Sequence, residues 1–370
     1  MKISTLMMCN QAPLPMNIQT PRLMNMDLFS PMREKKIEKV VVVMGATGAG
    51  KSHLSIDLAS RFPAEIINCD KIQVYEGLDI VTNKATEEEK RGVPHHLLGI
   101  ANPNADFTAA NFCDAAILAL KLISGRSCLP IIAGGSNSYI EALVENEDYK
   151  FRSRYDCCFL WVDVSAPVLH SFVSKRVDQM IENGMVEEVR KFFDPEANYR
   201  WGIRRAIGIP ELDRYLRAEL SLEEAIREIK ENTCKLACRQ LEKIHRLGNV
   251  KGWKLHRVDA TDVFRREGKE AAQAWEELVV APSTKIVRDF LLEKLIPSSF
   301  SSNAAAAQPW KWQWRNQFYE EGVGASLYSA ACRHEDSINS RTKAVEEDAI
   351  NLKLPTAMRS PAFSCKVSNK

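Results

Sequence analysis

The stretch from Val40 to Ser52 reads V-V-V-V-M-G-A-T-G-A-G-K-S and constrains the fold more than any other part of the chain. Its apolar, mostly β-branched first half is typical of a strand buried on both faces of a parallel sheet. The glycines that follow allow a tight turn whose backbone N–H groups converge on an anion at the start of a helix. This spacing, G-x-x-x-x-G-K-[ST], predicts a phosphate-binding loop. Its candidate binding residues are Gly45, Ala46, Thr47, Gly48, Ala49, Gly50, Lys51 and Ser52.

Two side chains of this motif bring charge or a metal to the phosphates. Lys51 supplies a positive charge, and the hydroxyl of Ser52 is the predicted ligand of a Mg²⁺ cofactor. Asp163, at the end of an apolar run, imitates the acidic residue that assists Mg²⁺ in many phosphate-loop proteins. Because an apolar run followed by Asp is common, an ordinary aspartate at the end of a strand is the alternative for Asp163.

The rest of the chain predicts a doubly wound α/β fold. Short apolar runs that alternate with amphipathic segments indicate a parallel sheet covered by helices. From Pro167 onward the pattern becomes helical. The further predicted strands lie at 64–69, 129–133 and 157–164, and the predicted helices of the second half lie at 167–183, 185–193, 204–218 and 221–247.

Four segments follow from these patterns. They are a leader at 1–36, an α/β core at 37–166, a mainly helical part at 167–297 that completes the substrate site, and a polar tail at 298–370 that we expect to be disordered. The acid-poor, weakly basic leader favours an organelle transit peptide, and hence a plastid rather than the cytoplasm. It is poor in Ser and Arg for such a peptide, so a plain disordered leader is the alternative.

The overall charge balance argues against some partners. The 370 residues include 50 Lys and Arg against 48 Asp and Glu, which leaves a net charge of +2 and gives no electrostatic reason to expect a duplex nucleic acid. The sequence contains no run of eighteen consecutive apolar residues, so it predicts no membrane-spanning helix. The 10 cysteines are scattered, as expected for reduced thiols, and form no carboxy-terminal Cys/His finger.

Several collinear blocks between about residues 38 and 296 resemble the isopentenyltransferases that prenylate the N6 amine of adenine. The blocks are Gly45–Ser52, Asn68–Tyr75, Gly77–Lys84, Val93–Leu97, Gly134–Tyr139, Asp178–Val189, Arg205–Gly208 and Ala237–Gln240. Within this family, the wording of Gly134–Tyr139 and Phe151–Asp163 is similar to the plant adenylate type that starts cytokinin synthesis. The resemblance implies a P-loop NTPase-like core that holds a departing diphosphate.

On the donor side, the implied substrate is dimethylallyl diphosphate. Lys51 and the loop amides would bind its diphosphate, and Thr47 would, by family match, donate to the bridging oxygen. Arg205 aligns with the family's diphosphate-binding arginine, although the adjacent Arg204 competes for that role. Lys235 and Arg239 are weaker candidates, because they lie on one cationic helix face that is normally solvated.

On the acceptor side, Asp70 follows a predicted strand and would accept a proton from the attacking amine. A place near the magnesium ion is the alternative for Asp70. The resemblance makes Asn68, Asn137 and Ser138 candidate contacts of the adenylate, without assigning their atoms.

The predicted enzyme is therefore an adenylate dimethylallyltransferase that uses AMP, ADP or ATP and needs no tRNA. Three alternatives stay open: a transferase acting on adenosine-37 of tRNA, a P-loop small-molecule kinase, and a nucleotide-binding module without catalysis. Neither the order of preference among the three nucleotides nor the oligomeric state follows from the sequence.

Overall fold

A parallel sheet forms the centre of the protein. In the computed structural model, which describes residues 37–196 and 199–293, its strand order is β3-β2-β4-β1-β5-β6 and every neighbouring pair is parallel. The strands are β1 (Glu38–Gly45), β2 (Ala64–Asn68), β3 (His95–His96), β4 (Leu129–Ala133), β5 (Tyr155–Asp163) and β6 (Leu255–Asp259). The predicted parallel α/β fold is confirmed.

The burial of β1 explains its sequence. Val40 to Met44 have no exposed surface, because β1 lies in the interior of the sheet and helices cover both faces. A strand in this place gains from β-branched side chains at every position rather than at alternate ones. The register sets Val43 and Asn68 beside the same residue, Ala133. The carboxyl ends of β1, β2 and β4 therefore meet at one edge of the sheet.

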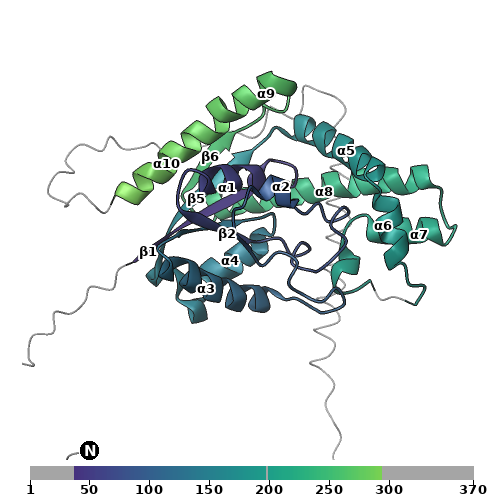
Figure 1. Ribbon diagram of the computed structural model, residues 1–370, viewed down its shortest axis with the longest axis horizontal. Helices are drawn as coiled ribbons and strands as arrows, with labels where there is room; N and C mark the ends of the chain where they lie inside the picture. The colour runs from purple at the N-terminus through teal and green to yellow at the C-terminus, as the bar shows by residue number, and fades with distance from the viewer. Residues whose placement is uncertain (1–36, 197–198, 294–370) are drawn as a thin grey trace, which may run out of the picture. The chain divides into compact units, whose positions relative to one another are not determined.

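Helices lie on both faces of the sheet (Figure 1). α3 (Ala109–Gly125) and α4 (Asn137–Glu145) pack on one face, whereas α1 (Lys51–Ala59), α9 (Gly268–Trp275) and α10 (Ala281–Leu292) pack on the other. The other helices are α2 (Glu87–Lys90), α5 (Ala166–Glu182), α6 (Met185–Phe192), α7 (Ile209–Leu216) and α8 (Leu222–Asn249). Strand β6 pairs with β5, so the chain returns to the sheet after α8.

A separate apolar cluster joins the helical part to the long connection between β2 and β3. Val74, Tyr75, Leu78 and Val81 of this connection are buried together with side chains of α5, α6, α7 and α8. Burial of these side chains ties an otherwise irregular segment to the helices. The connection is thus an ordered part of the fold, placed between the sheet edge and the helical part.

The helix predicted at 204–218 is wrong at its start. The structure has a 3₁₀ turn at Ile203–Arg205 and begins α7 only at Ile209. Gly208 interrupts the helix with φ +108°, a conformation suited to glycine, and an added Cβ would lie 2.6 Å from Val81 Cγ2. Pro210 then stands in the first turn of α7, where its missing N–H costs nothing.

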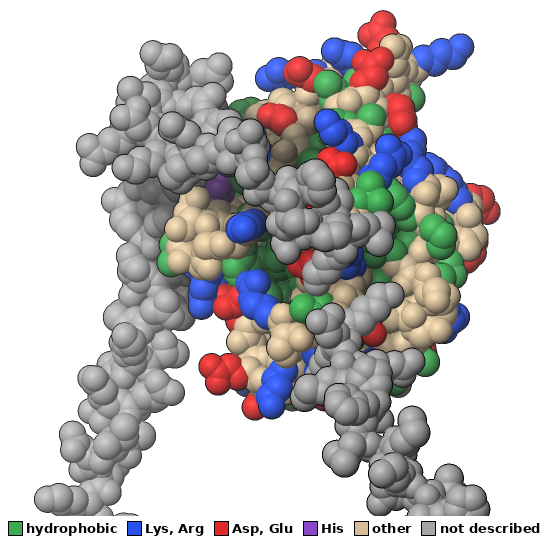
Figure 2. Space-filling view, turned by 90° about the vertical axis from the view of Figure 1, so that its left-hand side faces the viewer, with side chains coloured by type: hydrophobic (Ala, Val, Ile, Leu, Met, Phe, Trp, Pro, Cys, Tyr) green, Lys and Arg blue, Asp and Glu red, His purple; other side chains and the backbone are tan. Residues whose placement is uncertain are grey.

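All described residues belong to the first of two units, Met1–Pro297 and Ser298–Lys370. The predicted leader at 1–36 and tail at 298–370 lie outside the described residues. None of the described helices combines the length and apolarity needed to cross a bilayer. On the face drawn in Figure 2, basic and acidic side chains are interspersed, in keeping with the net charge of +2.

Candidate active site

The phosphate-binding loop connects β1 to α1 in the predicted strand-turn-helix arrangement. Gly48 and Gly50 have φ values of +82° and +92°, which residues other than glycine rarely adopt. A Cβ at Gly48 would lie 2.5 Å from Val173 Cγ1, and one at Gly50 would lie 2.7 Å from the Trp275 ring. The glycines are therefore required by backbone conformation and by the packing of α5 and α9 against the loop.

Lys51 is the buried cation of this loop. Its Nζ donates a hydrogen bond to Ala46 O at 2.7 Å, across the loop. Burial lowers the pKa of Lys51 to about 8, because the charged form loses solvation; Asp70 opposes this shift and Arg176 adds to it. A bound anion would replace the lost solvation, so a phosphate would stabilise the charged form of Lys51.

Arg176 of α5 is a second cation at the loop, and the sequence reasoning missed it. Its Nη2 donates to Thr47 Oγ1 at 3.0 Å. Its Nε is buried and has no hydrogen-bond partner among the described residues. Burial also lowers the pKa of Arg176. Arg176 looks like any other charged residue of an amphipathic helix, and only the packing of α5 on the loop reveals its position.

Gln240 of α8 joins the phosphate loop to the turn at residues 134–136, which connects β4 to α4. Its Oε1 accepts from the N–H of Thr47 at 2.7 Å, and its Nε2 donates to Gly135 O at 2.9 Å. Asn137, one of the predicted adenylate contacts, donates from Nδ2 to Gln240 O at 3.2 Å. The Oδ1 of Asn137 is buried without a partner among the described residues. Gln240 lay within a family block but had no predicted role.

Asp70 follows β2 at the same sheet edge. Its Oδ1 accepts from the N–H groups of Ile72 at 2.9 Å and Gln73 at 3.3 Å. Within the described residues both bonds use Oδ1, which leaves Oδ2 available to a ligand. Because Asp70 acts electrostatically on Lys51 and Arg176, the carboxylate and the two cations share one site.

The remaining acceptor-side candidates are placed differently from one another. Asn68 is buried, and its Nδ2 donates to Leu97 O at 3.0 Å and to Asp70 O at 3.5 Å, so it holds the end of β2. Ser138 is exposed in the first turn of α4. A role of either side chain in adenylate binding stays a prediction.

Arg204 and Arg205 have different environments. Arg204 is buried, and its Cζ lies 4.2 Å from the centre of the Phe192 ring. Its Nη1 donates to Phe192 O at 3.3 Å. Arg205 is partly exposed, and its Nη2 lies 3.4 Å from Tyr75 Oη and 3.7 Å from Asp106 Oδ1. These contacts favour a structural role for Arg204 and leave Arg205 as the arginine of this pair that a ligand can reach.

Lys235 and Arg239 are exposed on α8. Lys235 lies 4.0 Å from Glu231 on the same helix. Gln240 of the same helix contacts the phosphate loop at the N–H of Thr47. A clamp on phosphate by Lys235 and Arg239 stays a prediction.

Ser52 stays the candidate ligand of a magnesium ion, and this role stays a prediction. Ser52 is exposed in the first turn of α1, and its hydroxyl is the type of ligand that Mg²⁺ accepts beside water and phosphate oxygens. Among the described residues, no group of three or more His, Cys, Asp and Glu is arranged to hold a metal. Asp163 accepts from Arg257 Nε at 2.7 Å, which agrees with the structural alternative for this residue.

Comparisons with known proteins agree with this site. A family model described as IPP transferase matches residues 73–153 and 145–246. The chain is 56% identical to adenylate isopentenyltransferase 3, chloroplastic, of Arabidopsis thaliana, over 79% of this chain and 91% of the relative. This chain belongs to the adenylate isopentenyltransferase family. Its members are prenyltransferases, so the enzyme class predicted from the sequence is confirmed.

One further relative and one solved structure are also similar to this chain. Adenylate isopentenyltransferase 7, mitochondrial, of Arabidopsis thaliana is 57% identical over 68% of this chain and 80% of the relative. A eukaryotic dimethylallyltransferase acting on tRNA has a solved structure with a TM-score of 0.60 and 25% identity, over 69% of this chain and 80% of that one. The fold of this chain is thus shared by an enzyme that acts on tRNA.

Proposed function

We propose that this enzyme transfers the dimethylallyl group of dimethylallyl diphosphate to the N6 amine of AMP, ADP or ATP, the first step of cytokinin biosynthesis. One observation carries the proposal: Lys51 of the phosphate loop and Arg176 of α5, which donates to Thr47 of that loop, act on Asp70 at one sheet edge. Two cations suit a diphosphate, and one carboxylate suits an amine that loses a proton.

The donor side stabilises the leaving group. As the bond between C1 and the diphosphate oxygen breaks, its electron pair stays on the diphosphate. Lys51, Arg176 and the loop N–H groups would bind that growing negative charge, and they are fixed in place before the reaction. Magnesium at Ser52, when bound, would neutralise further phosphate charge.

The acceptor side makes the amine reactive. The lone pair of N6 is delocalised into the adenine ring, so the amine needs orientation and a proton acceptor. As N6 forms its bond to C1, Asp70 would accept the N6 proton through Oδ2, while Oδ1 stays bonded to the backbone. Asn137 Oδ1, buried without a partner among the described residues, is a further acceptor for a ligand donor.

The choice of a free nucleotide over tRNA rests on the relatives. The two adenylate isopentenyltransferases compared above are 56% and 57% identical to this chain, whereas the tRNA enzyme is 25% identical. The purified chain should form prenylated AMP, ADP or ATP without RNA, as measured by chromatography and mass spectrometry. Product only on an anticodon loop carrying adenosine-37 would favour the tRNA alternative, and ADP with a phosphorylated acceptor would favour a kinase.

We also propose a plastid location, because one similar relative is named chloroplastic. A second is named mitochondrial, so both organelles must be compared. The full chain fused to a fluorescent protein at its carboxyl end should colocalise with chlorophyll. Colocalisation with a mitochondrial dye, or a diffuse signal, would contradict the proposal.

A further inference from the structure

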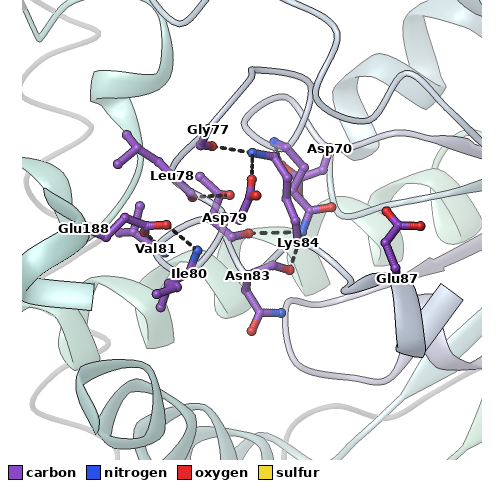
Figure 3. Close-up of polar contacts among 12 residues, drawn as sticks. Asp70, Gly77, Leu78, Asp79, Ile80, Val81, Asn83, Lys84, Glu87 and Glu188 are labelled. Atoms are coloured by element: carbon purple, nitrogen blue, oxygen red, sulfur yellow. Dashed lines mark hydrogen bonds and ion pairs between the residues drawn. The ribbon is translucent and has the colours of Figure 1, made fainter. Parts of the chain in front are cut away.

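The segment Gly77–Lys84, called here the acceptor loop, is closed on itself by its own polar groups (Figure 3). Lys84 Nζ donates to Gly77 O and lies 2.6 Å from Asp79 Oδ1. Thr82 Oγ1 donates to Leu78 O at 2.7 Å. The side chain of Lys84 is only 7% exposed. These contacts make the loop a compact unit.

The acceptor loop is linked to the carboxylate of Asp70 through the side chain and the backbone N–H of Gln73. Gln73 Nε2 donates to Thr82 O at 3.1 Å and to Asn83 O at 2.9 Å. The backbone N–H of the same residue donates to Asp70 Oδ1 at 3.3 Å. A displacement of the loop would therefore act on the turn that orients Asp70.

Glu188 of α6 holds the opposite side of the loop. Its Oε1 accepts from the N–H of Ile80 at 2.9 Å, and its Oε2 accepts from the N–H of Val81 at 2.8 Å. Figure 3 shows Glu188 reaching these groups from outside the loop. Glu188 is partly buried, and Val81 is buried in the cluster that joins the connection to the helices. The loop is thus clamped between α6 and the end of β2.

We infer that Glu188 is a positioning residue for the acceptor half of the reaction: it holds the acceptor loop, and through Gln73 the turn of Asp70, in the reactive arrangement. The inference rests on the proposed function, since it needs Asp70 to act on the amine. A carboxylate suits this task because its two oxygens pair with two neighbouring N–H groups. Glutamine offers one acceptor oxygen and one NH₂ group, so one loop N–H loses its partner.

The variants Glu188→Gln and Glu187→Gln form a matched pair. Glu187 is the preceding residue of α6, is exposed, and lies 3.4 Å from Arg190 on the same helix. For Glu188→Gln we expect kcat to fall and the nucleotide KM to rise, with kcat/KM for the nucleotide lower by about tenfold. The KM for dimethylallyl diphosphate should stay unchanged, and Glu187→Gln should match the unmodified enzyme in all constants.

Hydrogen exchange provides the readout that a general loss of stability would not give. In Glu188→Gln, amide exchange should become faster in peptides that cover 77–84, while peptides from the phosphate loop and the sheet keep their rates. Equal kinetics of the two variants, or faster exchange throughout the molecule, would overturn the inference. Absence of prenyl transfer by the unmodified enzyme would instead reject the proposed function.

A variant on the other side of the loop keeps the inference testable if Glu188→Gln does not fold. Gln73→Leu removes the bonds to Thr82 O and Asn83 O and leaves α6 intact. We expect the same pattern: a higher nucleotide KM, a lower kcat, an unchanged donor KM and faster exchange at 77–84. Unchanged nucleotide constants in Gln73→Leu would reject the connection between the loop and Asp70.

Discussion

The phosphate loop and the acceptor loop lie at the same edge of the sheet but are held in different ways. The phosphate loop owes its shape to glycines with positive φ and to a lysine that bonds within the motif. The acceptor loop has one such glycine, Gly77, and two non-glycine residues with positive φ, Leu78 and Asn83. Besides its internal contacts, it is held by Gln73 and Glu188 from outside it. The glycine spacing makes the phosphate loop recognisable from its own residues, whereas the contacts of Gln73 and Glu188 with the acceptor loop are set by the fold.

The difference predicts how each region should respond to substitution. Changes in the phosphate loop remove donor binding directly, because its groups contact the diphosphate in the proposed reaction. Changes around the acceptor loop act through backbone positions and should be smaller. The following experiments test this contrast, in order of decreasing effect.

Lys51→Ala should have the largest effect, since it removes the buried cation of the phosphate loop. We expect kcat/KM for dimethylallyl diphosphate to fall on the order of 10³–10⁴-fold, with a higher donor KM and a lower kcat. Steady-state kinetics with varied donor measures both constants. Near-normal turnover would contradict the assignment of this loop to the diphosphate.

Asp70→Asn separates the acceptor side from the donor side. We expect kcat to fall on the order of 10²–10³-fold, because the amide cannot accept the N6 proton. Donor binding should be largely kept, as measured by calorimetry with dimethylallyl diphosphate. A large loss of donor affinity with unchanged kcat would instead favour a place near magnesium for Asp70.

Gln240→Ala tests the bridge between the two turns. The substitution leaves the N–H of Thr47 and the carbonyl of Gly135 without their partner. One unpaired, partly buried group typically costs about 1–3 kcal/mol, so kcat/KM for the donor should fall by roughly tenfold or more. The exposed neighbour Arg239→Ala is compared in the same assay, and a larger loss there would favour the cationic-face prediction.

The pH dependence of kcat/KM for the donor should follow the titration of Lys51. Its pKa of about 8 means that the free enzyme loses this charge above pH 8, whereas an ordinary lysine stays charged to about 10.5. We expect kcat/KM for the donor to fall by about tenfold per unit above that pH, and Lys51→Arg to remove this limb if it retains activity. Between these two pKa values the unfolded state binds more protons, so this group makes stability rise with pH in that window. A limb unchanged in Lys51→Arg would assign the titration elsewhere.

Asp163→Asn should have the smallest effect. Asp163 is paired with Arg257 on a neighbouring strand, and we expect activity to stay within about twofold and stability to fall by about 0–1 kcal/mol. Activity at varied Mg²⁺ and thermal unfolding measure the two effects. A strong loss that excess Mg²⁺ reverses would support the metal role that the sequence left open.

The interior strands of the sheet were predicted more accurately than the start of α7, and the cause lies in the residues at each place. The strands beside the phosphate loop were predictable, because a buried parallel strand needs an apolar run and its end places the next residue at the ligand edge. The start of α7 was wrong, because Gly208 and Pro210 interrupt a pattern that otherwise continues through Arg204 and Arg205. The helical spacing of apolar residues carries no information about the positive φ of Gly208.

Reading the amino-acid sequence was enough to predict the phosphate loop, the parallel sheet, the carboxylate at the end of β2 and the family. Each depends on residues that are neighbours in the chain, so their spacing carries the information. The folded structure was needed to see that Arg176 and Gln240 reach Thr47, that Arg204 is buried, and that Glu188 holds the acceptor loop. These contacts join residues far apart in sequence, and their directions are set by how the helices pack on the sheet edge.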